Sequence, residues 1–98
     1  MFQYIFFEFL IDGGEENDYK VLFNEFGKYD LKCRFSDLQS EHSNFKKVGF
    51  ASGKIKNEGP NYSMSFKLIM EAFNKYNYKG SATVYHDLAN DFKIFRVN

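Results

Sequence analysis

The spacing of apolar side chains changes along this chain between a period of two and a period near 3.6 residues. A period of two is typical of strands, whose side chains alternate between faces, and the longer period is typical of helices that bury one side. The pattern predicts strands at 2–11, 30–38, 45–56, 81–86 and 92–97. It predicts one helix between the first two strands and another between the third and the fourth.

The first predicted strand, residues 2–11, is apolar on both of its faces. Only Gln3 and Glu8 interrupt a run of aromatic and aliphatic side chains, and such runs are typical of strands buried on both sides. We therefore expect this strand to occupy the middle of the sheet and to be covered over most of its area.

Each helix is predicted from an apolar stripe and from signals at its ends. The first stripe contains Tyr19, Leu22, Phe23 and Phe26. Acidic side chains near its first turn complement the positive end of the helix dipole, and the glycine after the stripe can end the helix. These residues are Glu15, Glu16 and Asp18 at the start and Gly27 at the end. The second stripe contains Phe66, Ile69, Met70, Phe73 and Tyr76.

The element order is therefore β-α-β-β-α-β-β, which predicts an α+β fold. Two helices that each bury one stripe pack most economically on the same face of a mostly antiparallel, two-layer sheet. The first six elements follow the split βαβ, ferredoxin-like order, and the last strand would extend one edge. Unrelated functions share this topology, so it assigns no activity by itself.

Composition agrees with one small domain. The chain has 98 residues, of which 44% are apolar and 20% aromatic, enough for one core and too few for two. No window approaches the roughly 18 uninterrupted apolar residues that a membrane helix needs. We expect a single α+β domain over residues 1–98 and no membrane segment. The abundance of Phe, Tyr, Asn, Lys and Ile, which have AT-rich codons, suggests a bacterial or phage gene.

Charge is balanced overall and unevenly distributed along the chain. Thirteen basic and thirteen acidic side chains give a formal net charge of zero, which disfavours binding to a polyanion such as nucleic acid. The first 30 residues hold seven acids and two lysines, a net charge of −5, and the remainder carries +5. In a two-layer fold this split can produce one acidic and one basic surface, which orients a protein partner.

Cysteine and histidine are too few for most catalytic or metal sites. Cys33 is the single cysteine, so no internal disulfide forms, and a cytoplasmic setting fits. Alternation places Cys33 on the core side, where a thiol fills space and does not pair with His86 as a nucleophile. His42 and His86 lack the spacing of a zinc site. We expect no catalytic residue, metal or cofactor.

The turn at 12–16 resembles a ligand loop only superficially. Asp12, two glycines, Glu15 and Glu16 follow one another, but acidic side chains at a helix start repel phosphate, and the spacing is not that of an EF-hand. The acids are better explained as a solvated helix cap. One enzymatic alternative stays open, a small hydrolase or nuclease that uses Asp12 in a site formed across two chains.

Two aromatic strands resemble parts of RNA-recognition motifs. Residues 5–10 are similar to the shorter strand motif of that family, and residues 47–51 are similar to the longer one. The resemblance implies stacking of bases on Phe6 and Phe50. Lysines of the second segment, Lys46, Lys47 and Lys54, would contact the backbone. An extra Val48 and a serine, Ser52, in place of an aromatic depart from the pattern.

The remaining feature is a surplus of aromatic side chains. Thirteen Phe and seven Tyr exceed what two helical stripes and one sheet face hide, and exposed aromatics carry much of the energy of protein interfaces. Five tyrosines are the candidates for surface positions: Tyr4, Tyr29, Tyr62, Tyr78 and Tyr85.

Without a catalytic constellation, the sequence favours a non-enzymatic protein-binding module that inhibits by occluding its partner, as toxin-immunity and phage anti-defence (anti-CRISPR) proteins do. Its acidic segment would meet a nuclease or other nucleic-acid-binding protein, and a homodimer is an open possibility. The residues expected to contact the partner are Glu15, Glu16, Asp18, Tyr19, Glu41 and His42. The alternative is an RNA- or DNA-binding domain that uses the aromatic strands and residues 46–56.

Overall fold

The predicted alternation of strands and helices is confirmed by a computed structural model, which describes residues 2–35, 48–56, 63–85 and 92–97. The elements are β1 (Phe2–Ile11), α1 (Glu16–Gly27), β2 (Lys32–Phe35), β3 (Gly49–Lys56), α2 (Ser63–Lys75), β4 (Gly80–Tyr85) and β5 (Phe92–Val97). Parts of the predicted strands, at 36–38 and 45–47, lie outside the described residues.

The strands form one antiparallel sheet in the order β2-β3-β1-β4-β5. β1 lies in the middle, as predicted from its apolar sequence, and pairs with β3 on one side and β4 on the other. β2 pairs with β3, and β5 pairs with β4, so both sequence-adjacent strand pairs predicted as hairpins are hydrogen-bonded. The edges of the sheet are therefore β2 and β5.

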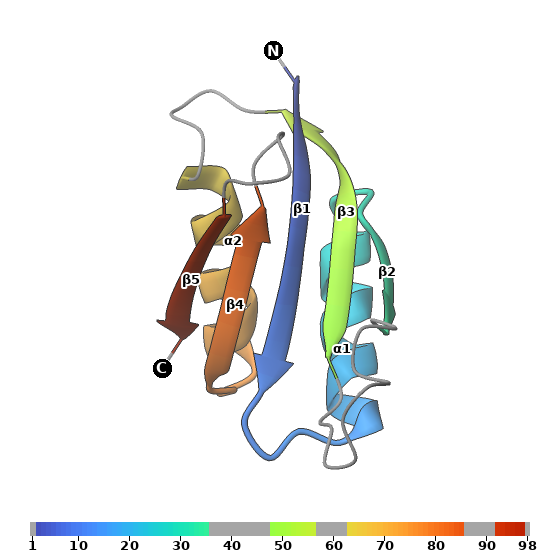
Figure 1. Cartoon of the computed structure of the whole chain (residues 1–98). Helices are drawn as coiled ribbons and strands as arrows, with labels where there is room; N and C mark the ends of the chain where they lie inside the picture. The colour runs from blue at the N-terminus through green and yellow to red at the C-terminus, as the bar shows by residue number, and fades with distance from the viewer. Residues whose placement is uncertain (1, 36–47, 57–62, 86–91, 98) are drawn as a thin grey trace.

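Both helices lie on the same side of the sheet (Figure 1). Aromatic contacts join each helix to an edge strand: Phe23 of α1 packs on Phe35 of β2, and Phe66 of α2 packs on Phe95 of β5. The fold thus has two layers, and the described helices leave the other face of the sheet uncovered.

The core lies between the sheet and the helices. β1 contributes Ile5, Phe7, Phe9 and Ile11, each at most 3% exposed. These side chains meet the stripe predicted for α1, in which Tyr19, Leu22 and Phe26 are fully buried and Phe23 partly so. Phe9 is the centre of this core, because its ring contacts Phe7, Tyr19, Phe23, Phe26 and Phe73.

Two expectations about burial are wrong in part. On α2, Met70 is 38% exposed, and the side chains buried there are Ser65, Leu68, Ile69, Ala72 and Phe73. The helix therefore turns Leu68 and Ala72 toward the core in place of Met70. On β1, only alternate side chains are buried, because both helices cover the same face, and Tyr4 on the opposite face is 52% exposed.

One carboxylate ties the two helices together. Glu25 of α1 accepts hydrogen bonds from Lys75 Nζ at 3.1 Å and from the Tyr76 hydroxyl at 2.9 Å. Lys28 Nζ reaches the same oxygen at 3.2 Å. The hydrogen bonds from Lys75 and Tyr76 hold the pKa of Glu25 below its ordinary value. This cluster fixes the end of α1 against the end of α2.

No helix in the described ranges combines the length and apolar character needed to cross a membrane.

Candidate functional site

The face of the sheet opposite the helices, here called the open face, carries the side chains that alternate with the core. On β1 these are Tyr4, Phe6, Glu8 and Leu10. Strand register brings other elements beside them, because Glu8 lies opposite Phe50 on β3 and opposite Thr83 on β4. The same alternation adds Lys32 and Arg34 from β2, Ser52 and Lys54 from β3, Ser81 and Tyr85 from β4, and Ile94 and Arg96 from β5.

Three aromatic rings form the centre of the open face. The Phe6 and Phe50 ring centroids are 4.6 Å apart at an interplanar angle of 89°, and the Phe6 and Tyr85 centroids are 5.3 Å apart at 85°. All three side chains are partly buried. Edge-to-face packing of this kind contributes about 0.5–1.5 kcal/mol per pair beyond area burial. The rings therefore form a fixed aromatic cluster across β3, β1 and β4.

The Phe50 ring is flanked on both sides by its own sheet. From β2, the Arg34 guanidinium lies over the ring, 4.6 Å from its centroid. From β1, on the opposite side of β3, Phe6 packs perpendicular to it. A base that stacks on Phe50 would have to displace Arg34. The geometry therefore favours a partner that contacts the solvent-facing side of the three rings over a base that inserts between them.

Glu8 lies next to the aromatic cluster and is held by Tyr85. The Tyr85 hydroxyl donates a hydrogen bond of 2.6 Å to Glu8 Oε1. Burial first, and then this hydrogen bond, raise the pKa of Tyr85 to about 12, so the phenol keeps its proton at neutral pH. The pair positions a carboxylate near the middle of the sheet.

Charge on the open face differs between its two sides. Lys32 and Arg34 of β2 and Lys54 of β3 are exposed on one side. On the other side, Arg96 of β5 pairs with Asp12 at the end of β1. The β2–β3 side is therefore basic, and Glu8 is the acidic side chain beside the aromatic centre.

Large apolar groups are exposed at two places on this face. Ile94 on β5 is 67% exposed, and Tyr4 on β1 is 52% exposed. Of the other tyrosines predicted at the surface, Tyr29 is exposed, Tyr78 and Tyr85 are partly buried, and Tyr62 lies outside the described residues. The aromatic surplus is thus divided: Tyr4 is exposed on the open face, Tyr29 is exposed in the turn after α1, and the Phe6, Phe50 and Tyr85 rings are partly buried.

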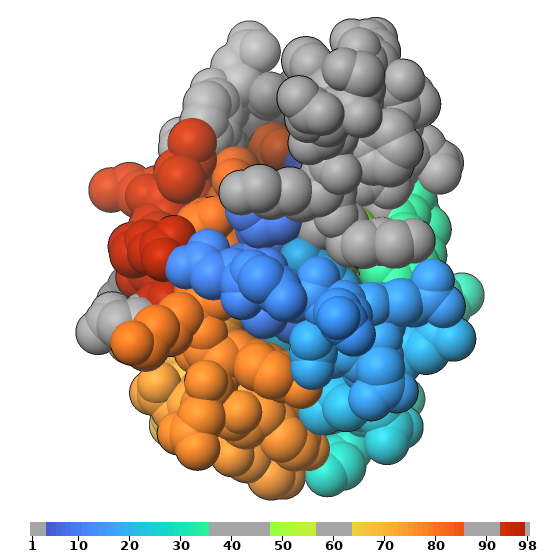
Figure 2. All heavy atoms as spheres, turned by 90° about the horizontal axis from the view of Figure 1, so that it is seen from below, coloured from blue at the N-terminus to red at the C-terminus, as the bar shows by residue number. Residues whose placement is uncertain are grey.

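The acidic segment predicted to bind a partner is mostly engaged within the chain. Glu15 and Glu16 are exposed, but Glu16 pairs with Lys20 at 3.2 Å. Asp18 accepts hydrogen bonds from the Glu15 backbone N–H and from the Tyr78 hydroxyl. Figure 2 shows the blue end of β1 and the following turn in the middle of this end of the molecule, between red β5 and α1.

Tyr19, also predicted as a contact residue, lies in the core. Its ring is fully buried, and its hydroxyl accepts a hydrogen bond of 2.8 Å from the Ile11 backbone N–H. Tyr19 therefore presents no surface to a partner, because the same stripe that defines α1 turns it toward β1. The predicted residues Glu41 and His42, and the lysines Lys46 and Lys47, lie outside the described residues.

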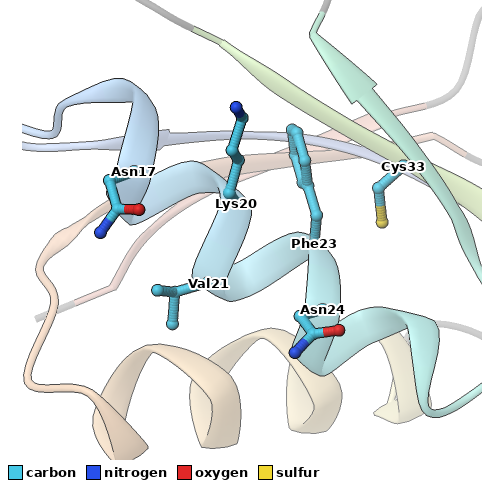
Figure 3. Close-up of a pocket in the computed structure, with 6 residues that line it drawn as sticks. All are labelled: Asn17, Lys20, Val21, Phe23, Asn24 and Cys33. Atoms are coloured by element: carbon cyan, nitrogen blue, oxygen red, sulfur yellow. The ribbon is translucent and has the colours of Figure 1, made fainter.

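A hollow of about 550 Å³ lies between α1 and β2, away from the open face. Figure 3 shows its lining residues, with Cys33 on β2 facing the helix that carries Lys20 and Phe23. Burial raises the pKa of the Cys33 thiol to about 11, so at neutral pH the thiol is protonated and is a poor nucleophile. His86, the histidine considered from the sequence and rejected as its partner, lies outside the described residues.

Within residues 2–35, 48–56, 63–85 and 92–97, no group of three or more His, Cys, Asp or Glu side chains is placed to hold a metal ion. Comparison of the chain with known proteins finds no matching family model, no matching curated protein and no matching solved structure.

Phe6, Phe50 and Lys54 were predicted from the sequence to share one surface and Tyr85 was predicted as a surface tyrosine, but Glu8, Arg34 and Ile94 were not predicted as parts of it. Each missed residue alternates along its strand with side chains of the opposite face, so it lies on the open face. Parity alone tells which side chains share a face within one strand, whereas the register between strands decides which of them meet.

Proposed function

We propose that this chain is a non-enzymatic protein-binding module and that it contacts its partner through the open face. The observation that carries the proposal is the aromatic cluster of Phe6, Phe50 and Tyr85 at the centre of a sheet face that the described helices do not cover. A rigid aromatic centre surrounded by polar and charged side chains is the usual anatomy of a protein interface.

Three properties of the open face support a protein as the partner: its fixed rings, its exposed apolar groups and its basic side chains. Rings held by mutual edge-to-face contacts lose little side-chain entropy on binding, so their contact energy is retained. Exposed Tyr4 and Ile94 extend the apolar area on either side of the centre. Basic side chains on β2 and β3 then favour a partner whose acidic groups lie opposite this side of the open face in the complex.

The mode of action that we propose is inhibition by occlusion, as in toxin-immunity or phage anti-defence proteins, in the cytoplasm. Such a role requires complementary shape and charge and no chemistry of its own. We also assign the fold to the ferredoxin-like class. The sheet order β2-β3-β1-β4-β5, with β5 as an added edge, supports this assignment.

The test is capture of a partner by the full chain, followed by charge substitutions on opposite faces. Tyr4→Glu and Ile94→Glu should each abolish capture, because they place charge in the proposed interface. Met70→Glu is the matched control, since Met70 is also exposed but lies on α2. Loss of capture by Met70→Glu with retention by both open-face variants would refute the surface assignment.

A nucleic-acid partner is the second candidate, because the structure places Phe6 beside Phe50 with Lys54 and Lys32 on the same face. Stacking on Phe6, with phosphates near the lysines, would then drive binding. Titration of the chain with a mixed single-stranded oligonucleotide pool at several salt concentrations decides between the two. A steep salt slope that Lys54→Ala reduces supports nucleic acid, and no binding below about 100 μM removes it.

A further inference from the structure

A hollow of about 210 Å³ opens on the open face beside the aromatic cluster. Its polar lining comes from Glu8 on β1 and from Ser81 and Thr83 on β4, and Leu10 and Val48 supply apolar walls. Strand register explains the grouping, because Glu8 lies opposite Thr83 and Leu10 lies opposite Ser81. The polar groups therefore converge from two neighbouring strands onto one place.

The Glu8 carboxylate is only half satisfied in this hollow. Oε1 accepts the hydrogen bond from the Tyr85 hydroxyl, while Oε2 has no hydrogen-bond donor or cation within the part of the chain that the structure describes. A partly buried carboxylate with a free oxygen gains most from a positively charged donor, because charge-assisted hydrogen bonds are the stronger ones. The hydroxyls of Ser81 and Thr83 offer further acceptors at the same place.

We propose that this hollow binds an arginine side chain of the protein partner, with the guanidinium on Glu8. This inference rests on the proposed function and names the chemistry that the partner presents at the centre of the interface. A guanidinium has several donors in a planar fork, so it can reach the carboxylate and a neighbouring hydroxyl together.

Charge complementarity favours this occupant over others. Glu8 repels phosphate and carboxylate groups, so the hollow does not suit the backbone of a nucleic acid or an acidic side chain. The cations of the open face are engaged elsewhere or lie on its rim: Arg34 covers Phe50, and Arg96 pairs with Asp12. The partner's arginine would therefore neutralise a charge that the described part of this chain leaves uncompensated.

The experiment is an NMR titration of the full ¹⁵N-labelled chain with blocked tripeptides, acetyl-Gly-Arg-Gly-amide being the main probe. We expect saturable shifts at the backbone amides of Glu8, Leu10, Ser81 and Thr83. Glu8→Gln keeps the shape of the side chain and should weaken binding at least about fivefold. Glu16→Gln, at an exposed acid on α1, is the matched control and should bind like the unmodified chain.

Several results would overturn the assignment. Unchanged binding by Glu8→Gln is one, and an equal response to the corresponding glutamate tripeptide is another. An equal response to the lysine tripeptide would show that the hollow accepts any cation and does not select a guanidinium. Shifts caused by guanosine monophosphate and by none of the tripeptides would indicate that the hollow binds a nucleobase. Thr83→Val, which keeps the side-chain shape, should also weaken binding and gives a second variant if Glu8→Gln does not fold.

This test fails separately from that of the proposed function. If the arginine tripeptide does not bind but Tyr4→Glu and Ile94→Glu still abolish capture of a partner, only the arginine site is wrong. If neither open-face variant affects capture, the proposed interface is wrong, whatever the tripeptide does.

Discussion

Removal of the Tyr19 hydroxyl measures how strongly the core holds the end of β1. The hydroxyl accepts the hydrogen bond from the Ile11 backbone N–H at 2.8 Å, and both residues are buried. The ring stacks on Phe9 with centroids 5.8 Å apart. Tyr19→Phe keeps that ring and its packing and removes the hydroxyl that accepts this hydrogen bond.

The expected loss of unfolding free energy follows from what happens to the Ile11 backbone N–H after the substitution. With no hydroxyl, the Ile11 N–H stays buried without an acceptor, which costs about 1–3 kcal/mol. For a domain of this size, each kcal/mol lowers the melting temperature by roughly 4–8 °C. Tyr19→Phe should therefore melt several degrees below the unmodified chain and show a lower midpoint in urea.

Urea and thermal unfolding followed by circular dichroism provide the measurement. Tyr29→Phe is the matched control, because Tyr29 is 46% exposed; the stability of this variant should differ from that of the unmodified chain by less than about 0.5 kcal/mol. If Tyr19→Phe loses no more than this control, the reasoning is refuted, because the Ile11 N–H must then find another acceptor.

Three further predictions concern other parts of the molecule. The hydrogen bond from Lys75 is the main cause of the lowered pKa of Glu25, so the stability from this group is present above the ordinary glutamate value of 4.5 and is lost as the pH falls through the folded-state pKa. Glu25→Gln should flatten the acid limb of the unfolding free energy measured against pH, and an unchanged limb would contradict the role given to this cluster. A Cβ at Gly80 would overlap the Leu10 carbonyl oxygen, so Gly80→Ala should cost at least about 1–3 kcal/mol in urea unfolding, and a neutral result would show that the strands can separate there. Cys33, with its pKa raised to about 11, should react with iodoacetamide at pH 8 about 100-fold more slowly than an exposed thiol and reach the ordinary rate in denaturant; fast reaction of the folded chain would contradict the raised pKa.

The elements were predictable because their signals are local. The apolar run at 2–11 identified β1 and its central position, and the stripe from Tyr19 to Phe26 identified α1. Both signals depend on side-chain periodicity within one element, which the backbone geometry imposes directly. For α2 the same approach chose Met70 as a buried residue, while the structure buries Leu68 and Ala72. Several rotations of an apolar helix fit its sequence, and packing against the sheet selects one of them.

The candidate site was less predictable than the fold. Phe6 and Phe50 were paired by their resemblance to aromatic strand motifs, and they do meet. The acidic segment was chosen by charge alone, and its members prove to be engaged in helix capping, ion pairing and the core. Charge along a chain does not show which groups already have partners, since those partners come from distant segments such as the one that holds Tyr78.

The amino-acid sequence by itself determined the number, type and order of the elements, the central place of β1 in the sheet, and the absence of a second cysteine for a disulfide. Only the tertiary structure decided that Phe6, Phe50 and Tyr85 form one cluster, that Glu8 lies in a hollow beside it, and that Tyr19 is unavailable to a partner. The physical reason is range: periodicity acts over a few residues, whereas strand register joins positions up to about eighty residues apart, as between Glu8 and Tyr85, which are 77 residues apart.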